Sequence, residues 1–192
     1  MDLLAYVQIE DLDKIAQENG IVIPRLRGYR LMRDERPLTK EEINAIKKDA
    51  EIEALAGLLH AVPFFSPSSR ISNYNDRIRR IEGYYFVTDI DEKGNEYYSD
   101  IRWDRIHGKK RKALKMAIKK AHRRVEAQYN TWNKYAGRED VLYIHSRMGG
   151  GNWEYYDGKK ELMSQPWFLD RVDDWWDGTY CDFYAKIKKE EM

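Results

Sequence analysis

Cysteine is nearly absent from this 192-residue chain, which contains Cys181 and no second cysteine. A single thiol excludes a disulfide within the chain and excludes a metal site built from several thiolates. The composition is typical of a reducing compartment, where disulfides are rare. Nucleophilic catalysis has no support, because no obvious base accompanies Cys181 and no serine lies in a nucleophile-elbow motif.

Long apolar runs are also missing. No run approaches the roughly 18 residues that would indicate a membrane-spanning helix. The first six residues, Met-Asp-Leu-Leu-Ala-Tyr, lack the basic region and the apolar core of a secretory signal peptide. We therefore expect a cytoplasmic protein with no membrane partner.

Acidic residues are absent from one basic segment. Residues 105–124 contain ten Lys or Arg and no Asp or Glu, whereas residues 170–182 contain five Asp and one Arg. The formal net charge of +1 hides this separation. The two segments either attract each other in the fold, or each faces a partner of opposite charge.

Aromatic residues, by contrast, are plentiful. The chain has 14 Tyr, 6 Trp and 5 Phe, which argue against disorder although 35% of its residues are charged. We expect one compact domain, in which residues 1–62 form an N-terminal helical region and residues 63–192 form an α+β core.

Apolar spacing predicts three helices. The first covers about residues 9–19 and ends at Gly20. A capping box at Thr39 and Glu42 begins the second, which ends at Pro63. The third and longest runs from residue 108 to about residue 135. Its apolar positions, which recur every three or four residues, are Leu114, Ile118, Ala121, Val125, Tyr129 and Trp132.

Four segments have the composition of β-strands, namely residues 83–90, 96–103, 141–148 and 179–187. Ser164-Gln165-Pro166 indicates the start of another helix. The predicted fold is therefore α+β. It has a small, mostly antiparallel sheet of about four strands packed against one long basic helix, with an N-terminal helical region.

The basic helix is the first candidate site. Its cations are Lys109, Lys110, Arg111, Lys112, Lys115, Lys119, Lys120, Arg123 and Arg124. Solvated helices normally mix both signs of charge at a spacing of four residues, so a helix without acids favours contact with a polyanion over simple solvation. An acidic protein surface is the main competing partner.

A glycine-rich segment after the third predicted strand is the second candidate. Its residues are His145, Arg147, Gly149, Gly150, Gly151, Asn152 and Trp153. Such a loop can approach a ligand closely or cradle an anion, although it has neither P-loop nor dinucleotide-binding spacing. A wide turn with Trp153 packed beneath it explains the pattern equally well. In a strand, His145 and Arg147 share a face and could bind phosphate or donate a proton, or His145 could satisfy a core hydrogen bond.

Clustered aspartates are the third candidate. They are Asp170, Asp173, Asp174, Asp177 and Asp182. Together with His145 they could bind Mg²⁺ or Mn²⁺, as in a nuclease. The pattern fits a helix end and turn better, so the sequence predicts an acidic patch for a partner, with no metal and no cofactor.

Several motifs carry a resemblance to known proteins. They are Ile23–Met32, Trp103–Lys109, Ile144–Trp153, Gln165–Phe168, Val172–Asp174 and Thr179–Tyr184. With these motifs, most of the chain resembles a family of proteins from bacteriophages and prophages of Gram-positive bacteria. The resemblance implies a small accessory protein that acts on host machinery, and it assigns no catalytic residues.

The resulting functional hypothesis is a non-enzymatic, phage-encoded anti-defence protein in the host cytoplasm. It would bind and block a host protein or ribonucleoprotein, with a CRISPR–Cas effector of the Cas9 type as the first target. Three alternatives stay open: a DNA- or RNA-binding module of phage replication or regulation, a metal-dependent nuclease or phosphoesterase, and a nucleotide-signal binding protein. Homo-oligomerisation also stays open.

Overall fold

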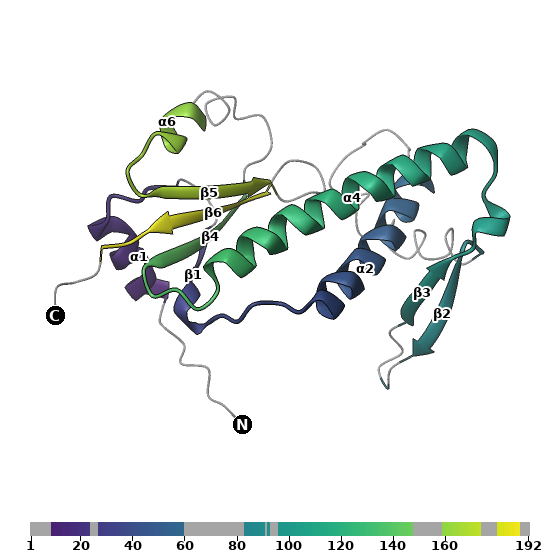
Figure 1. Cartoon of the computed structure of the whole chain (residues 1–192), viewed down its shortest axis with the longest axis horizontal. Helices are drawn as coiled ribbons and strands as arrows, with labels where there is room; N and C mark the ends of the chain where they lie inside the picture. The colour runs from purple at the N-terminus through teal and green to yellow at the C-terminus, as the bar shows by residue number, and fades with distance from the viewer. Residues whose placement is uncertain are drawn as a thin grey trace. The chain divides into compact units, whose positions relative to one another are not determined.

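The chain has an α+β fold, shown as a computed structural model in Figure 1. The structure describes residues 9–23, 27–59, 83–90, 92, 96–147, 159–173 and 180–188. Two compact units are present, one of residues 1–38 and 127–192 and the other of residues 39–126. This division lies at different residues from the expected boundary after residue 62. Helix α4 (Gly108–Tyr135) contributes residues to both units.

A four-stranded antiparallel sheet is the centre of the first unit. Its strands lie in the order β1 (Arg27–Leu31), β4 (Val141–Arg147), β6 (Tyr180–Lys186) and β5 (Phe168–Asp173). All three neighbouring pairs are antiparallel. The two central strands alternate in their side chains, so that each face of the sheet receives every second residue.

Helix α1 (Ile9–Glu18) covers one face of this sheet. The buried residues of that core are Leu12, Ala16, Ile21, Ile23, Leu31, Leu142, Ile144, Trp167, Cys181, Phe183 and Ala185. Leu142 and Phe183 have no exposed surface, and a fully buried side chain of this size contributes about 1.5–3 kcal/mol. Cys181 is buried in this core, where its side chain contributes to packing.

The last turns of α4 cover the other face. Tyr135 of α4 stacks on Tyr184 of β6 with ring centroids 4.9 Å apart. Trp132 meets Tyr143 of β4 edge to face at 5.5 Å. The helix ends where Gly137 takes a positive φ of 80° and its amide donates to the carbonyl of Met32. This face therefore combines aromatic packing with the polar residues described below.

The second unit combines α2 (Lys40–Leu59), the first part of α4, and a hairpin of β2 (Tyr85–Ile90) and β3 (Glu96–Ile101). Its buried core consists of Ile52, Leu55, Tyr85, Ile101, Ile106, Leu114 and Ile118. The predicted capping box is confirmed. The amide of Thr39 donates to Glu42 at 2.8 Å, and the amide of Glu42 donates to the Thr39 hydroxyl at 3.2 Å.

Two details of the predicted architecture are wrong. Strands β2 and β3 form a separate two-stranded sheet, and the four-stranded sheet instead contains β1 and β5. The expected helix after Pro166 is strand β5, preceded by the short helix α6 (Lys159–Met163). The reason is pairing, because β5 completes its backbone hydrogen bonds along β6.

Two short 3-10 helices, η1 (Met32–Asp34) and η2 (Trp103–Arg105), complete the described elements. None of the helices in the described ranges has the length and apolar character needed to cross a bilayer.

Candidate functional site

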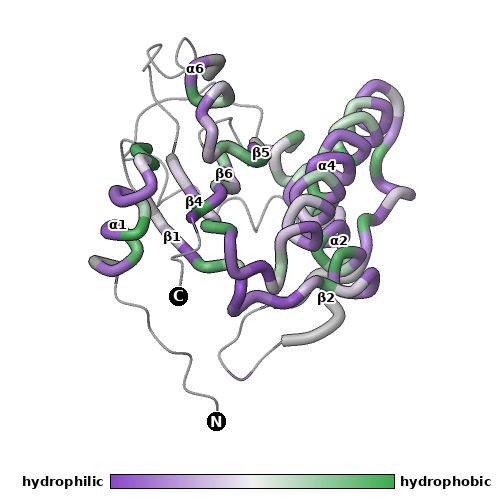
Figure 2. Tube along the Cα trace, turned by 60° about the vertical axis from the view of Figure 1, so that its left-hand side comes forward, coloured by the Kyte–Doolittle hydropathy of each residue, from purple (hydrophilic) through white to green (hydrophobic). Residues whose placement is uncertain are grey.

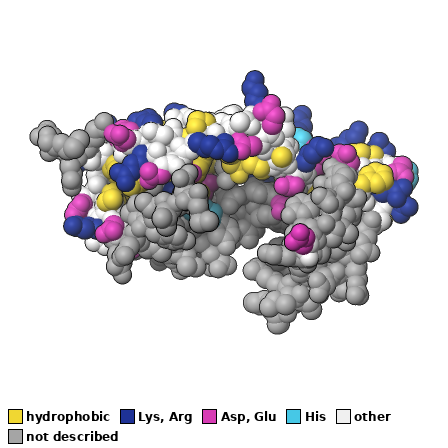
Figure 3. Space-filling view, turned by 90° about the horizontal axis from the view of Figure 1, so that it is seen from below, with side chains coloured by type: hydrophobic (Ala, Val, Ile, Leu, Met, Phe, Trp, Pro, Cys, Tyr) yellow, Lys and Arg dark blue, Asp and Glu magenta, His cyan; other side chains and the backbone are white. Residues whose placement is uncertain are grey.

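The basic segment lies on α4, as the sequence predicted. Of the nine candidate cations, Arg111 and Arg124 are half-buried and the other seven are exposed. Figure 2 shows hydrophilic segments recurring on successive turns of α4, and in Figure 3 Lys and Arg side chains are interspersed with Asp and Glu over the visible described surface.

Five of these cations share one side of the helix. At 3.6 residues per turn, an arc of about 100° contains this group, which we call the cationic face. It consists of Lys109, Lys112, Lys119, Lys120 and Arg123. Met116 lies in the middle of the arc and is 67% exposed. The opposite side of the helix carries the buried apolar residues Leu114, Ile118, Ala121 and Val125. Burial of that stripe forces the cations outward.

Acidic side chains in the described part of the chain neutralise little of the positive charge of the cationic face. In the described part of the chain, the four lysines of the face form no ion pair, and Arg123 contributes weakly to the environment of Glu126. Lys47 is the chief partner of Glu126: its hydrogen bond of 2.6 Å and its charge lower the pKa of that carboxyl group. Within the described residues, no acidic side chain is therefore paired with these four lysines.

Two neighbouring cations are engaged with an aromatic ring. The guanidinium of Arg111 donates to the carbonyl of Trp103 at 3.0 Å and lies 5.5 Å from its ring centroid. The ammonium of Lys115 lies 5.9 Å from the same centroid. These contacts hold both side chains on the flank of the helix, away from the cationic face.

Asp170 is the member of the acidic patch whose side chain the structure describes, and it does not neutralise the cationic face. Asp170 accepts hydrogen bonds from Lys134, at 2.8 Å, and from the hydroxyl of Tyr135. Burial alone would raise the pKa of Asp170, but these two hydrogen bonds outweigh it and lower the pKa. The side chain of Asp173 and the whole of Asp174 and Asp177 lie outside the described residues.

Asp182 is separate from that patch and is buried, with 1% of its surface exposed. Its Oδ1 accepts a hydrogen bond from Tyr143 at 2.9 Å and lies 2.7 Å from Nδ1 of His145, which donates to it. Its Oδ2 accepts from the Gln128 side chain of α4 at 3.1 Å. Burial and the nearby charge of Asp182 raise the pKa of Tyr143, so its phenol stays protonated.

The register of the sheet explains this cluster. His145 lies opposite Asp182 on the neighbouring strand, and Tyr143 lies opposite Tyr184, all on the face covered by α4. The sequence pattern placed Asp182 with the other aspartates and gave no sign of this network, because His145 and Asp182 are 37 residues apart in the chain. The carboxylate orients the His145 ring, and 41% of that side chain remains exposed.

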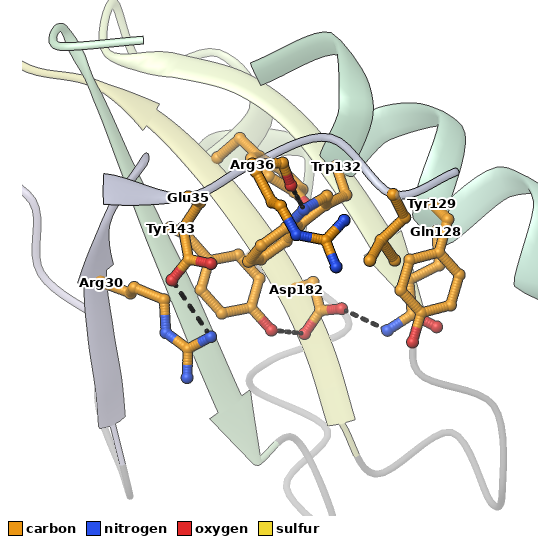
Figure 4. Close-up of a pocket in the computed structure, with 10 residues that line it drawn as sticks. Arg30, Glu35, Arg36, Gln128, Tyr129, Trp132, Tyr143 and Asp182 are labelled. Carbon is orange, nitrogen blue, oxygen red and sulfur yellow. Dashed lines mark hydrogen bonds and ion pairs between the residues drawn. The ribbon is translucent and has the colours of Figure 1, made fainter. Parts of the chain in front are cut away.

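A cavity of about 410 Å³ lies beside Asp182 (Figure 4). Its lining residues are Arg30, Glu35, Arg36, Leu38, Gln128, Tyr129, Trp132, Tyr143, Asp182 and Tyr184. All belong to the first unit. Most of these positions were not singled out from the sequence, because β1, the segment after η1, α4, β4 and β6 bring them together only in the fold.

Of the glycine-rich candidate segment, the structure describes His145 completely and Arg147 in part. The backbone of Arg147 lies in β4, while its side chain and the whole of Gly149, Gly150, Gly151, Asn152 and Trp153 lie outside the described residues. Within the described ranges, no three His, Cys, Asp or Glu side chains converge as a set of metal ligands.

We compared the chain with models of protein families, with curated proteins and with solved structures, and none of them matched. Its function must therefore be inferred from its own side chains.

Proposed function

We propose that this protein binds duplex DNA, with the cationic face of α4 lying along the major groove. The observation that carries the proposal is the set of four exposed lysines, Lys109, Lys112, Lys119 and Lys120, that form no ion pair within the described residues. Phosphates supply the missing negative charge, and the release of their counterions drives binding. No catalytic step is needed.

The shape of the face favours a groove over a flat surface. An α-helix fits the major groove of B-form DNA, which is about 12 Å wide. From Lys109 to Arg123 the face is about 21 Å long at 1.5 Å per residue. Exposed Met116 lies between the lysines and exposed Ala113 lies beside the edge of the face, so apolar side chains would face the base edges while the cations reach the phosphates.

Salt dependence of binding is the direct test. With five phosphate contacts, the logarithm of the binding constant should fall with the logarithm of salt concentration at a slope of about −4.5. Affinity for a fluorescent 20-base-pair DNA, measured by polarisation, should drop by about 10² to 10³ between 50 and 200 mM salt. A slope near zero would contradict phosphate contact.

Duplex RNA of the same length is the matched control for groove entry. Its major groove is deep and narrow, so a helix cannot enter it. We expect RNA to bind at least about tenfold more weakly than DNA at the same salt. Equal affinities for duplex RNA and duplex DNA would contradict binding of α4 in the major groove.

The second proposed function is anti-defence activity, in which the protein blocks a host nucleoprotein. It is favoured by the resemblance of the motifs at residues 144–153 and 179–184 to phage and prophage proteins. A Cas9–guide complex should lose cleavage of a target plasmid when the protein is added at a small molar excess. Carrier DNA without a target site should not relieve the inhibition, since relief would indicate simple coating of the substrate. Full cleavage at every protein concentration would count against a Cas9-type target.

A further inference from the structure

We infer that the cavity beside Asp182 binds a nucleotide, meaning a nucleobase that carries a phosphate. This inference does not depend on DNA binding by α4, because it concerns different residues, all in the first unit. The cavity volume of about 410 Å³ is in the usual range for a small-molecule site.

Aromatic rings form much of the lining. Tyr129 and Trp132 come from α4, Tyr143 from β4 and Tyr184 from β6. The rings of Trp132 and Tyr143 meet edge to face at 5.5 Å, and those of Tyr143 and Tyr184 are tilted at the same distance. A planar, heteroaromatic ring is the ligand for which such a lining is suited, because every nucleobase has a face that stacks on aromatic side chains.

Polar groups sit beside these rings. The carboxylate of Asp182 and the amide of Gln128 bond to each other and both line the cavity. The hydroxyl of Tyr184 is buried and has no hydrogen-bond partner among the described residues, although Tyr184 also lines the cavity. Buried hydroxyl groups are nearly always paired in proteins, so a ligand group that reached this hydroxyl would supply a missing hydrogen bond. Nucleobase edges supply such donors and acceptors.

Arg36 provides the contact for phosphate. Figure 4 shows its guanidinium reaching over the cavity between Trp132 and Tyr129. That guanidinium also donates to the carbonyl of Pro37 at 3.1 Å, and the other lining arginine, Arg30, pairs with Glu35 at 3.3 Å. A guanidinium carries five N–H donors, so one such bond does not exhaust it. A guanidinium binds phosphate through two parallel hydrogen bonds, which makes Arg36 the anchor for the charged end of a nucleotide.

The entrance side of the cavity is held in place before any ligand arrives. The indole of Trp132 donates to the carbonyl of Arg36 at 3.0 Å. The Asn133 side chain accepts from the amide of Leu38 at 2.7 Å and donates to its carbonyl at 2.9 Å. These bonds fix the segment that carries Arg36 on α4, which reduces the entropy lost on binding.

Calorimetric titration of the full chain tests the inference, with AMP, GMP, CMP and UMP as probes. The corresponding nucleosides and inorganic phosphate are titrated in parallel. At least one mononucleotide should bind about tenfold or more tightly than its nucleoside and than phosphate, because only the nucleotide fills both ends of the cavity. Absence of binding by all four at 1 mM, or equal binding by phosphate alone, would overturn the inference.

Three variants locate the site. Arg36→Gln should weaken nucleotide binding about tenfold while the affinity for the nucleoside stays within twofold. Arg33→Gln is the matched control, because Arg33 is exposed, pairs with its neighbour Asp34 and does not line the cavity. Tyr184→Phe keeps the ring, removes the unpaired hydroxyl and should weaken nucleotide binding severalfold. Equal affinities in all three variants would place the ligand elsewhere. A 5′-phosphorylated oligonucleotide that displaces the mononucleotide would identify a strand end as the source of the ligand, and failure to displace it would identify the free nucleotide.

Discussion

Replacement of Lys112, Lys119 and Lys120 by glutamine is expected to weaken duplex DNA binding about 100-fold at 100 mM salt. Each lysine that contacts a phosphate contributes about one unit to the salt slope, so the slope should fall from about −4.5 to about −2. Glutamine retains helix propensity and side-chain length, so the fold should be unchanged. Polarisation titrations at four salt concentrations measure both quantities.

Net charge must be separated from position in this experiment. A control with Lys14, Lys40 and Lys188 replaced by glutamine loses the same three charges from exposed sites outside α4. We expect this control to bind DNA within about threefold of the parent chain, because long-range attraction is screened beyond about 10 Å at 0.1 M salt. Equal weakening by both triple variants would show that only overall charge matters and would contradict the assignment of the cationic face.

Asp182→Ala is expected to lower the free energy of unfolding by about 3–5 kcal/mol. Removal of the buried carboxylate leaves the Tyr143 hydroxyl, the Gln128 amide and the His145 ring without their acceptor. Hydrogen bonds to a charged group are worth about 1.5–3 kcal/mol each, and donors left unpaired in a buried site add to the loss. The free energy of unfolding of Asp182→Asn should lie between those of the parent chain and of Asp182→Ala, since one amide oxygen cannot replace both carboxylate oxygens.

Urea denaturation followed by tryptophan fluorescence measures this loss. The control is Asp34→Ala, because Asp34 is exposed and pairs only with the neighbouring Arg33 in the described structure. Its effect should stay within about 0.5 kcal/mol. If Asp182→Ala changed the free energy of unfolding by less than 1 kcal/mol, the buried network would not be a determinant of the fold.

Local pattern alone predicted a large part of this fold. The three- and four-residue steps from Leu114 to Trp132 predicted α4, and Thr39 with Glu42 predicted the start of α2. Composition predicted β4, and alternation predicted β6. These signals are short in range, because helix periodicity, capping and strand alternation each depend on residues that are close in sequence. The exposure of the cationic face also followed from the sequence, since the apolar stripe of the same helix must be buried.

Strand partnership was beyond the reach of local pattern. Trp167, Phe168 and Val172 suit one face of a helix as well as they suit a strand, and pairing with β6 decided for the strand. In the same way, β2 and β3 form a separate two-stranded sheet, and nothing in their composition distinguishes them from strands of the larger sheet.

The sequence by itself determined α1, α2 and α4, the two central strands and the outward charge of α4. Only the tertiary structure decided that Asp182 meets His145, Tyr143 and Gln128, and that Arg36 and Tyr184 line one cavity. The physical reason is register. A shift of one residue between β4 and β6 would move every side chain to the opposite face, and that choice depends on the burial of the whole sheet.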